Sequence, residues 1–433
     1  MKKWLLLFAV LLFALPVCAL EVVYPRTTMP TISSATTFFV GNTQAPLKIN
    51  GADVLVHPSG SFAYVVQLNS GANVFTLESG DEKQVYVINR PMPVTGGSYI
   101  PPVLTEYDAP INMIVSADNA PLRSTPVDAG INRLSHLPCG VGLVVDGEKG
   151  EFYRVVLDNN TKAWIAKSNV KLDIGQSAVI CNYEHTQTDD YDIYTFDICG
   201  KAPYIITEGN PLKLTFYKGD DSSVYEFLLK HKLYGYSGGF DGDKFVLKIR
   251  KCPRFKVVID PGHGGSEIGS ISCLGDKEKD LNLAIAKLLE EELKLRGAEV
   301  VMTREDDSYA GLQQRVDIAN TNDATIFVSI HANALPDSLD PNKYRGTSVY
   351  YYYDQAKPLA QAVLNSVTAG AGTQNDGVHQ GSLAVVRNTQ AVSILVEVGY
   401  MINPDDSALL ADYNFQKKCA ESIADGIQNY LKN

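Results

Sequence analysis

Two scarcities narrow what this 433-residue chain can do. Basic side chains are outnumbered, with 38 Lys and Arg against 49 Asp and Glu and a formal net charge of −11. Phosphate recognition needs clustered Lys and Arg, so this balance argues against nucleic-acid binding. Long apolar runs are also missing, because no stretch after residue 19 approaches the about 18 apolar residues that a membrane helix requires. We therefore expect no nucleic-acid partner and no stable membrane span.

The N-terminus has the pattern of an export signal. Two lysines precede the apolar run from Trp4 to Leu15, and Val17 to Ala19 supply a cleavage site of small residues. This pattern predicts a secretory signal peptide over residues 1–19 and a secreted protein of the periplasm or cell envelope. Acylation of Cys18, as in a lipoprotein, is the alternative interpretation of the same residues.

Cysteine is sparse in the rest of the chain. An even number in an oxidising compartment permits disulfides, and Cys181 with Cys199 is the predicted local bridge. Buried free thiols are the alternative for the six residues. These are Cys139, Cys181, Cys199, Cys252, Cys273 and Cys419.

The composition is that of a folded globular protein, and the length predicts two to four domains. Residues 20–90 predict a small immunoglobulin-like β-domain. Its best local signal is Asn50-Gly51 between two strand-like runs, because both positions of a tight hairpin turn need positive φ. Residues 91–107 are rich in proline at their start and predict a linker.

Two further β-segments follow the linker. Short alternating strands joined by Gly, Pro and Asp turns make residues 108–173 resemble a bacterial SH3-like β-barrel. Trp164 is interpreted there as a core aromatic rather than a platform for a ligand. Residues 176–251 predict an accessory β-domain. The strings that carry the SH3-like resemblance are Ala120 to Pro126, Leu137 to Gly140, Phe152 to Val155 and Ala163 to Ile165.

From Phe255 onward, predicted strands alternate with helices. Leu281 to Leu295 places apolar residues at helical spacing, and Gly297 follows as a helix stop. This alternation predicts an α/β domain with a mostly parallel sheet flanked by helices, and with its site at the carboxyl ends of strands. The predicted strands are Phe255–Ile259, Glu299–Met302, Thr325–Ile330, Ser348–Tyr352 and Ser393–Val396.

Two histidines and two glutamates stand at junctions of these elements. His263 and His331 each follow a strand, Glu278 opens a helix and Glu397 ends a strand. Such a set suits a catalytic zinc, which takes three nitrogen or oxygen ligands and leaves one position for water. The sequence motifs that contain these four residues are Asp260 to Gly265, Glu278 to Asn282, Ser329 to Asn333 and Val396 to Tyr400.

Through these four motifs together, residues 254–433 resemble the zinc-dependent N-acetylmuramoyl-L-alanine amidases. The resemblance implies a hydrolase that cuts the amide bond between N-acetylmuramic acid and L-alanine in peptidoglycan. It implies His263, Glu278 and His331 as zinc ligands and Glu397 as the general base. Glu267 is the rival carboxylate for the metal, and Cys273 on the same loop is not needed to complete the set.

The resemblance also bears on the substrate groove. Asn333 is expected to orient the site or contact substrate, and His379 either lines the groove or is an exposed loop residue. Asp376 stands where relatives often have arginine, which leaves the role of that loop open. A helix over Gln355 to Ala369 fills most of the segment in which some relatives carry a blocking helix, so no such helix is expected.

Two other functions fit parts of this pattern. One is a zinc peptidase that cuts within the stem peptide, and the other is an inactive wall-binding protein. The first 250 residues contain no plausible catalytic set. They predict targeting and spacing modules that bind the wall, with envelope proteins as alternative partners.

Overall fold

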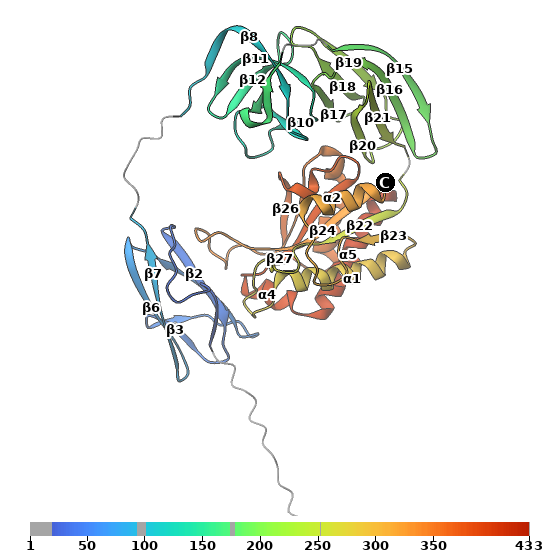
Figure 1. Ribbon diagram of the computed structural model, residues 1–433. Coiled ribbons are helices and arrows are strands. Elements are labelled where there is room, and N and C mark those ends of the chain that lie inside the picture. Colours follow the sequence, from blue (N-terminus) through green and yellow to red (C-terminus); the bar gives the residue numbers. More distant parts are fainter. Residues whose placement is uncertain (1–19, 93–100, 174–177, 252, 433) are drawn as a thin grey trace, which may run out of the picture.

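The computed structural model describes residues 20–92, 101–173, 178–251 and 253–432. The predicted signal peptide and Cys252 lie outside the described residues, as do residues 93–100 of the predicted linker. Figure 1 shows an N-terminal β-unit in blue, a middle β-unit in green and a C-terminal α/β domain in yellow to red. No helix within the described ranges is long and apolar enough to cross a membrane.

The N-terminal β-unit consists of two sheets around a common apolar core. Asn50 (φ 50°) and Gly51 (φ 79°) form the turn of a hairpin, which confirms that prediction. One sheet contains β1 (Glu21–Tyr24), β2 (Thr36–Asn42) and β5 (Ser61–Gln67). The other contains β3 (Leu47–Ile49), β4 (Ala52–Val54), β6 (Gly71–Ser79) and β7 (Glu82–Arg90).

The middle β-unit, β8 to β21, combines both segments that the sequence predicts as separate domains. They share one apolar core that extends from Met113 to Ile249. The first segment forms one sheet of β8 (Thr105–Val115), β9 (Ala120–Arg123), β10 (Arg133–Leu137), β11 (Gly142–Lys149), β12 (Phe152–Val156), β13 (Lys162–Ala166) and β14 (Val170–Leu172). A 3-10 turn, η1 (Lys167–Asn169), precedes β14. The second segment forms a sheet of β15 (Val179–Gln187), β16 (Tyr191–Cys199), β21 (Lys244–Arg250) and β20 (Tyr236–Asp241). It also forms a sheet of β17 (Tyr204–Thr207), β18 (Leu212–Tyr217) and β19 (Ser222–Phe227).

Three predictions for this unit are wrong. The linker does not reach residue 107, because β8 already begins at Thr105. Trp164 is not a core residue: it is only partly buried, and its neighbours Ala163 and Ile165 turn the opposite face of β13 to the core.

The predicted disulfide between Cys181 and Cys199 is wrong, because both thiols are free and exposed. Antiparallel pairing places Cys199 opposite Val179, two residues before Cys181. The two cysteines are therefore neighbours in the sheet without being cross-strand partners.

The C-terminal domain is built on one six-stranded sheet in the order β23-β22-β24-β27-β25-β26. All neighbouring pairs are parallel except β25 with β27, so the sheet is mostly parallel, as predicted. The strands are β22 (Lys256–Pro261), β23 (Glu299–Met302), β24 (Ile326–Asn333), β25 (Thr347–Tyr351), β26 (Asn375–Gln380) and β27 (Val392–Tyr400). β26 was not predicted.

Helices cover both faces of this sheet (Figure 1). Residues of α1, α3 and α5 share a core with Val257 and Ile259, whereas α2 packs with Val258 on the opposite face. The helices are α1 (Glu278–Leu295), α2 (Leu312–Thr321), α3 (Lys357–Gly370), α4 (Pro404–Leu410) and α5 (Tyr413–Lys432). Two 3-10 turns, η2 (Asp354–Ala356) and η3 (Ala384–Val386), lie beside them. The α3 helix belongs to the core, so among the described residues no separate helix lies between β25 and β26.

The α1 helix shows how the apolar spacing works. Leu281, Ile285 and Leu289 are buried as predicted, and Gly297 (φ 86°) follows the helix end. Leu295 is 82% exposed, contrary to prediction. The buried line advances four residues at a time to position 293, so position 295 faces away from the sheet.

The N-terminal β-unit is docked on the C-terminal domain. Phe38 and Val40 belong to the apolar core of that domain. Tyr24 donates a hydrogen bond from its hydroxyl to the Asp337 carboxylate at 2.5 Å. The amide of Asn42 donates to the carbonyl oxygen of residue 273 at 3.2 Å. The first unit is thus part of one packed structure with the α/β domain.

Candidate metal centre and active site

Three of the predicted site residues converge at the carboxyl edge of the sheet. His263 follows β22, Glu278 is the first residue of α1 and His331 lies near the end of β24. Glu278 Oε1 is 3.1 Å from His263 Nε2 and 3.0 Å from His331 Nδ1. One nitrogen or oxygen atom from each side chain lies within 4.8 Å of the other two. The three side chains therefore form a cluster with the spacing that a metal ion requires.

Glu278 is held in this cluster as an ionised carboxylate. The residue is buried, and Glu278 Oε2 accepts a hydrogen bond from the backbone N–H of Ser270 at 2.8 Å. Burial alone raises the pKa of Glu278, but hydrogen bonds from His263 and His331 outweigh it and lower the pKa well below its usual value. The carboxylate consequently keeps its charge and its ability to bind a cation.

Two glycines leave the space around the cluster. A Cβ on Gly262 would lie 2.2 Å from His331 Nε2, and a Cβ on Gly269 would lie 2.4 Å from Glu278 Oε2. Side chains at these positions would therefore overlap the cluster itself. This close approach gives a physical reason for glycine at both positions.

Buried arginines brace the loop that carries His263. Arg315 Nη2 donates to the His263 carbonyl oxygen at 2.8 Å, and its Nη1 donates to Asp260 Oδ1 at 2.5 Å. Arg304 Nη2 donates to the carbonyl oxygens of Gly262 at 3.0 Å and Lys279 at 2.7 Å. Sequence reasoning missed both arginines, because each lies more than forty residues from Asp260 and belongs to no local motif.

Glu397 lies beside the cluster, and one of its carboxylate oxygens is unpaired in the described structure. It lies within β27, which continues to Tyr400, and is the cross-strand neighbour of His331. Its Oε2 is shielded from solvent and has no hydrogen-bond partner among the described residues. Burial raises the pKa of Glu397 to about 7; the charge of His331 opposes this shift and that of Glu278 adds to it. Glu397 can therefore take up and release a proton near neutral pH.

The two predicted substrate-binding residues, Asn333 and His379, make contacts outside the cluster. The Asn333 side chain accepts a hydrogen bond from the next backbone N–H at 2.8 Å, a local contact that does not involve the three ligating side chains. His379 is exposed on β26, with its ring centroid 5.3 Å from that of Tyr350. Asp376 accepts a hydrogen bond from the Tyr400 hydroxyl at 2.7 Å. The loop is thus tied to β27, and His379 lies on an exposed edge.

Two rival ligands are not part of the cluster. Glu267 is exposed and lies outside the group of converging side chains. Cys273 is fully buried in the apolar core, where burial raises the pKa of its thiol to about 12. Neither residue therefore belongs to the cluster of His263, Glu278 and His331.

The sheet and the cluster define an α/β domain with a candidate metal site at the carboxyl ends of its strands. Residues 257–429 match the family described as N-acetylmuramoyl-L-alanine amidase. The chain is 34% identical over 178 residues to YqiI of Bacillus subtilis, covering 40% of this chain and 84% of that protein. The chain belongs to the N-acetylmuramoyl-L-alanine amidase family.

Two further proteins are similar to part of this chain. The probable cell wall amidase LytH of Staphylococcus epidermidis is 34% identical over 179 residues, which cover 41% of this chain and 58% of LytH. The solved structure of the amidase AmiC2 of Nostoc punctiforme is 41% identical and covers 41% of this chain and 97% of that one, with a TM-score of 0.39. The similarity in each case covers about two fifths of the chain.

Proposed function

We propose that this protein is a zinc-dependent hydrolase that cleaves the amide bond between N-acetylmuramic acid and L-alanine in peptidoglycan. One observation carries the proposal: His263, Glu278 and His331 converge beside Glu397, whose buried Oε2 has no hydrogen-bond partner among the described residues. Two imidazole nitrogens and a carboxylate oxygen are a donor set that catalytic zinc sites use. Gly262 and Gly269 leave the space that His331 and Glu278 occupy free of other side chains.

The proposed zinc ion would be held by three side chains and would supply only part of the chemistry. His263, Glu278 and His331 would hold it, and when bound it supplies Lewis-acid polarisation of a carbonyl oxygen and acidifies water. The protein must therefore supply the proton transfers and keep the ligands in place. Arg304 and Arg315 serve the second purpose, because they fix the backbone carbonyls around His263.

Glu397 is the proposed proton carrier. Its unpaired Oε2 would accept a proton from the attacking water and return that proton to the departing nitrogen of L-alanine. A carboxyl with a pKa of about 7 can perform both steps near neutral pH. Buried surroundings strengthen its interaction with charge that develops in the site.

Analysis of digested peptidoglycan tests this function. Mass spectrometry should detect intact stem peptides released from the glycan strands. Shortened stems that stay attached to the glycan would instead show a zinc peptidase, and an absence of products would show an inactive wall-binding protein.

We further propose export to the cell envelope and a targeting role for the two β-units. The charged and apolar pattern of residues 1–19 supports export. Tethering raises the effective concentration of an enzyme on an insoluble polymer, which supports targeting. Binding of the full chain and of exposed-surface variants of the middle β-unit to intact cell walls would test that role.

A further inference from the structure

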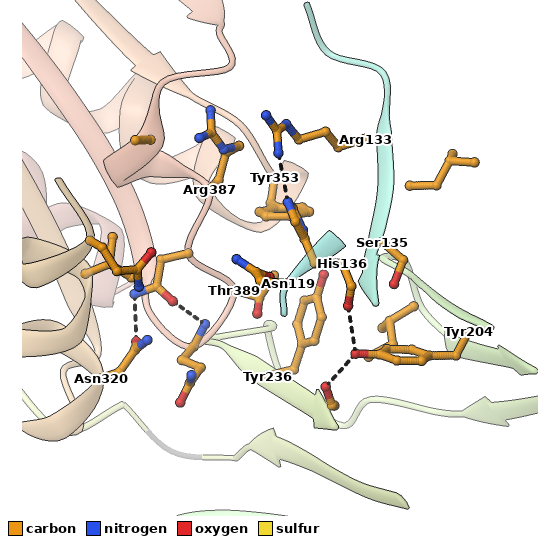
Figure 2. A pocket seen from close by; sticks show the side chains of 18 of the residues that line it. Asn119, Arg133, Ser135, His136, Tyr204, Tyr236, Asn320, Tyr353, Arg387 and Thr389 are labelled. Carbon is orange, nitrogen blue, oxygen red and sulfur yellow. Dashed lines mark hydrogen bonds between the residues drawn. The ribbon is translucent and has the colours of Figure 1, made fainter. Parts of the chain in front are cut away.

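A cavity lies between the middle β-unit and the C-terminal domain. Its volume is about 470 Å³, and its walls come from β10, β17 and β20 on one side and from α2 and the segment before β27 on the other. None of the three ligating side chains, nor Glu397, lines it. Figure 2 shows the side chains that point into this space, and we call it the interdomain cavity.

Two arginines without a nearby carboxylate in the described structure line the interdomain cavity. Arg133 from β10 and Arg387 from the segment after η3 both line it. Within the described part of the chain, neither guanidinium has a carboxylate within 4.0 Å, whereas other arginines such as Arg154 do. Arginines brought together without a counter-charge are a binding site for an anion.

The hydrogen bonds around the two arginines leave donors free. Arg133 Nη1 contacts His136 Nε2 at 3.1 Å, and Arg133 Nε is buried without a partner in the described structure. Burial, followed by the charges of Arg133 and Arg387, lowers the pKa of His136 to about 4, so this ring is neutral and accepts from Arg133. Arg387 Nη1 donates to the carbonyl oxygen of Ser382 at 2.6 Å. Arg133 and Arg387 come from opposite walls, and Figure 2 shows both side chains at the same end of the cavity, near Tyr353.

The rest of the lining favours a ligand larger than a simple anion. Pockets of roughly 300–1,000 Å³ hold small organic ligands, so this cavity exceeds the needs of one phosphate ion. Amide side chains offer both donors and acceptors, as a peptide backbone requires. Tyrosine rings offer flat surfaces for aliphatic groups. The amides include Asn119, Asn320 and Asn388, and the rings are those of Tyr204, Tyr236 and Tyr353.

We infer that the interdomain cavity is a second, non-catalytic binding site for a short acidic peptide, with Arg133 and Arg387 pairing its carboxylates. The inference rests on the proposed function in one respect, since hydrolysis of the muramoyl–alanine bond releases stem peptides that carry free carboxylates. A site of this kind would hold the enzyme next to stems or respond to released product.

Calorimetric titration of the full chain tests the site. The probe is the synthetic peptide L-Ala-γ-D-Glu-L-Lys with both amino groups acetylated and both carboxylates free, and its diamide is the neutral control. His331→Ala serves as the background, so that peptide binding at the metal cluster does not contribute. Arg133→Gln and Arg387→Gln should each weaken peptide binding about 10-fold or more, as expected for loss of a charge-assisted hydrogen bond.

Arg154→Gln is the matched control, because Arg154 belongs to the same sheet as Arg133 but is paired with Asp146 and Glu106. It should leave peptide affinity unchanged. Far-UV circular dichroism checks that each variant is folded. Arg387→Lys keeps the positive charge, so it should lose less peptide affinity than Arg387→Gln, and it replaces any variant that does not fold. The inference is overturned if peptide and diamide bind with equal affinity, or if the cavity variants bind the peptide as tightly as the background protein. It is also overturned if the protein binds inorganic phosphate but not the peptide. Peptide binding by a wild-type protein that releases no stems would overturn only the proposed function.

Discussion

Replacing Arg315 with methionine should destabilise the C-terminal domain strongly. Arg315 lies on α2 with 4% of its side chain exposed, and its partner Asp260 is 1% exposed. Methionine fills similar space but leaves the Asp260 carboxylate buried without its counter-charge. Breaking one side of such a buried pair typically costs about 3–5 kcal/mol of unfolding free energy.

The structure places the expected cost near the lower end of that range. Asp260 keeps hydrogen bonds from the hydroxyls of Thr303 at 2.6 Å and Ser329 at 2.7 Å, which still support its charge. We therefore expect about 3 kcal/mol, which lowers the melting temperature of a domain of this size by about 6–12 °C. The zinc affinity should fall as well, because the His263 carbonyl oxygen loses its donor.

Calorimetric melting of the full chain measures this effect. Arg254→Gln is the control, because Arg254 is 60% exposed and its ion pair with Asp190 should contribute at most about 1 kcal/mol. Adding Asp260→Asn to Arg315→Met removes the uncompensated charge and should recover part of the loss. A melting temperature for Arg315→Met within about 2 °C of the control (about 1 kcal/mol or less) would show that Asp260 does not need Arg315 as its counter-charge.

Three further predictions follow from the site and its surroundings. Glu397 must be ionised to accept a proton, so kcat/KM should fall as pH drops below about 7, and the charge of a bound ion can only move this limb to lower pH; a rate that rises on acidification would contradict this role. Burial raises the pKa of Glu208 to about 7 from 4.5, so protein stability should decrease as pH rises between those values, and Glu208→Gln should flatten melting temperatures across that range. Gly269→Ala should abolish zinc binding in metal analysis because its Cβ would lie 2.4 Å from Glu278 Oε2, whereas Gly311→Ala, with its nearest atom 3.9 Å away, should bind normally.

The C-terminal domain is predictable from local patterns. Alternating apolar strands and the α1 spacing depend on neighbours within a few turns, so β23 and the start of α1 match their predicted positions. His263 and His331 meet because parallel strands end at the same edge of a sheet. The β26 strand has few apolar residues and lies at the sheet edge, so it carries no such pattern.

Contacts between distant segments were not predictable. Nothing in the sequence around Phe38 distinguishes burial inside the N-terminal unit from burial against the C-terminal domain. The same holds for Arg315, whose partner Asp260 is 55 residues away. Trp164 was assigned to the core because aromatic residues are often buried, whereas its strand turns the smaller Ala163 inward. Such choices depend on which surfaces meet, which a local pattern does not contain.

Zinc content and amide hydrolysis should be measured together on matched variants, because the proposed function assigns metal binding and proton transfer to different residues. Glu397→Gln should retain one zinc per chain and lose about 10²-fold or more in rate, the usual scale for a positioned general base. His331→Ala should lose zinc and activity together while the β-units stay folded. Near-normal turnover in Glu397→Gln, or full zinc and normal activity in His331→Ala, would contradict the account.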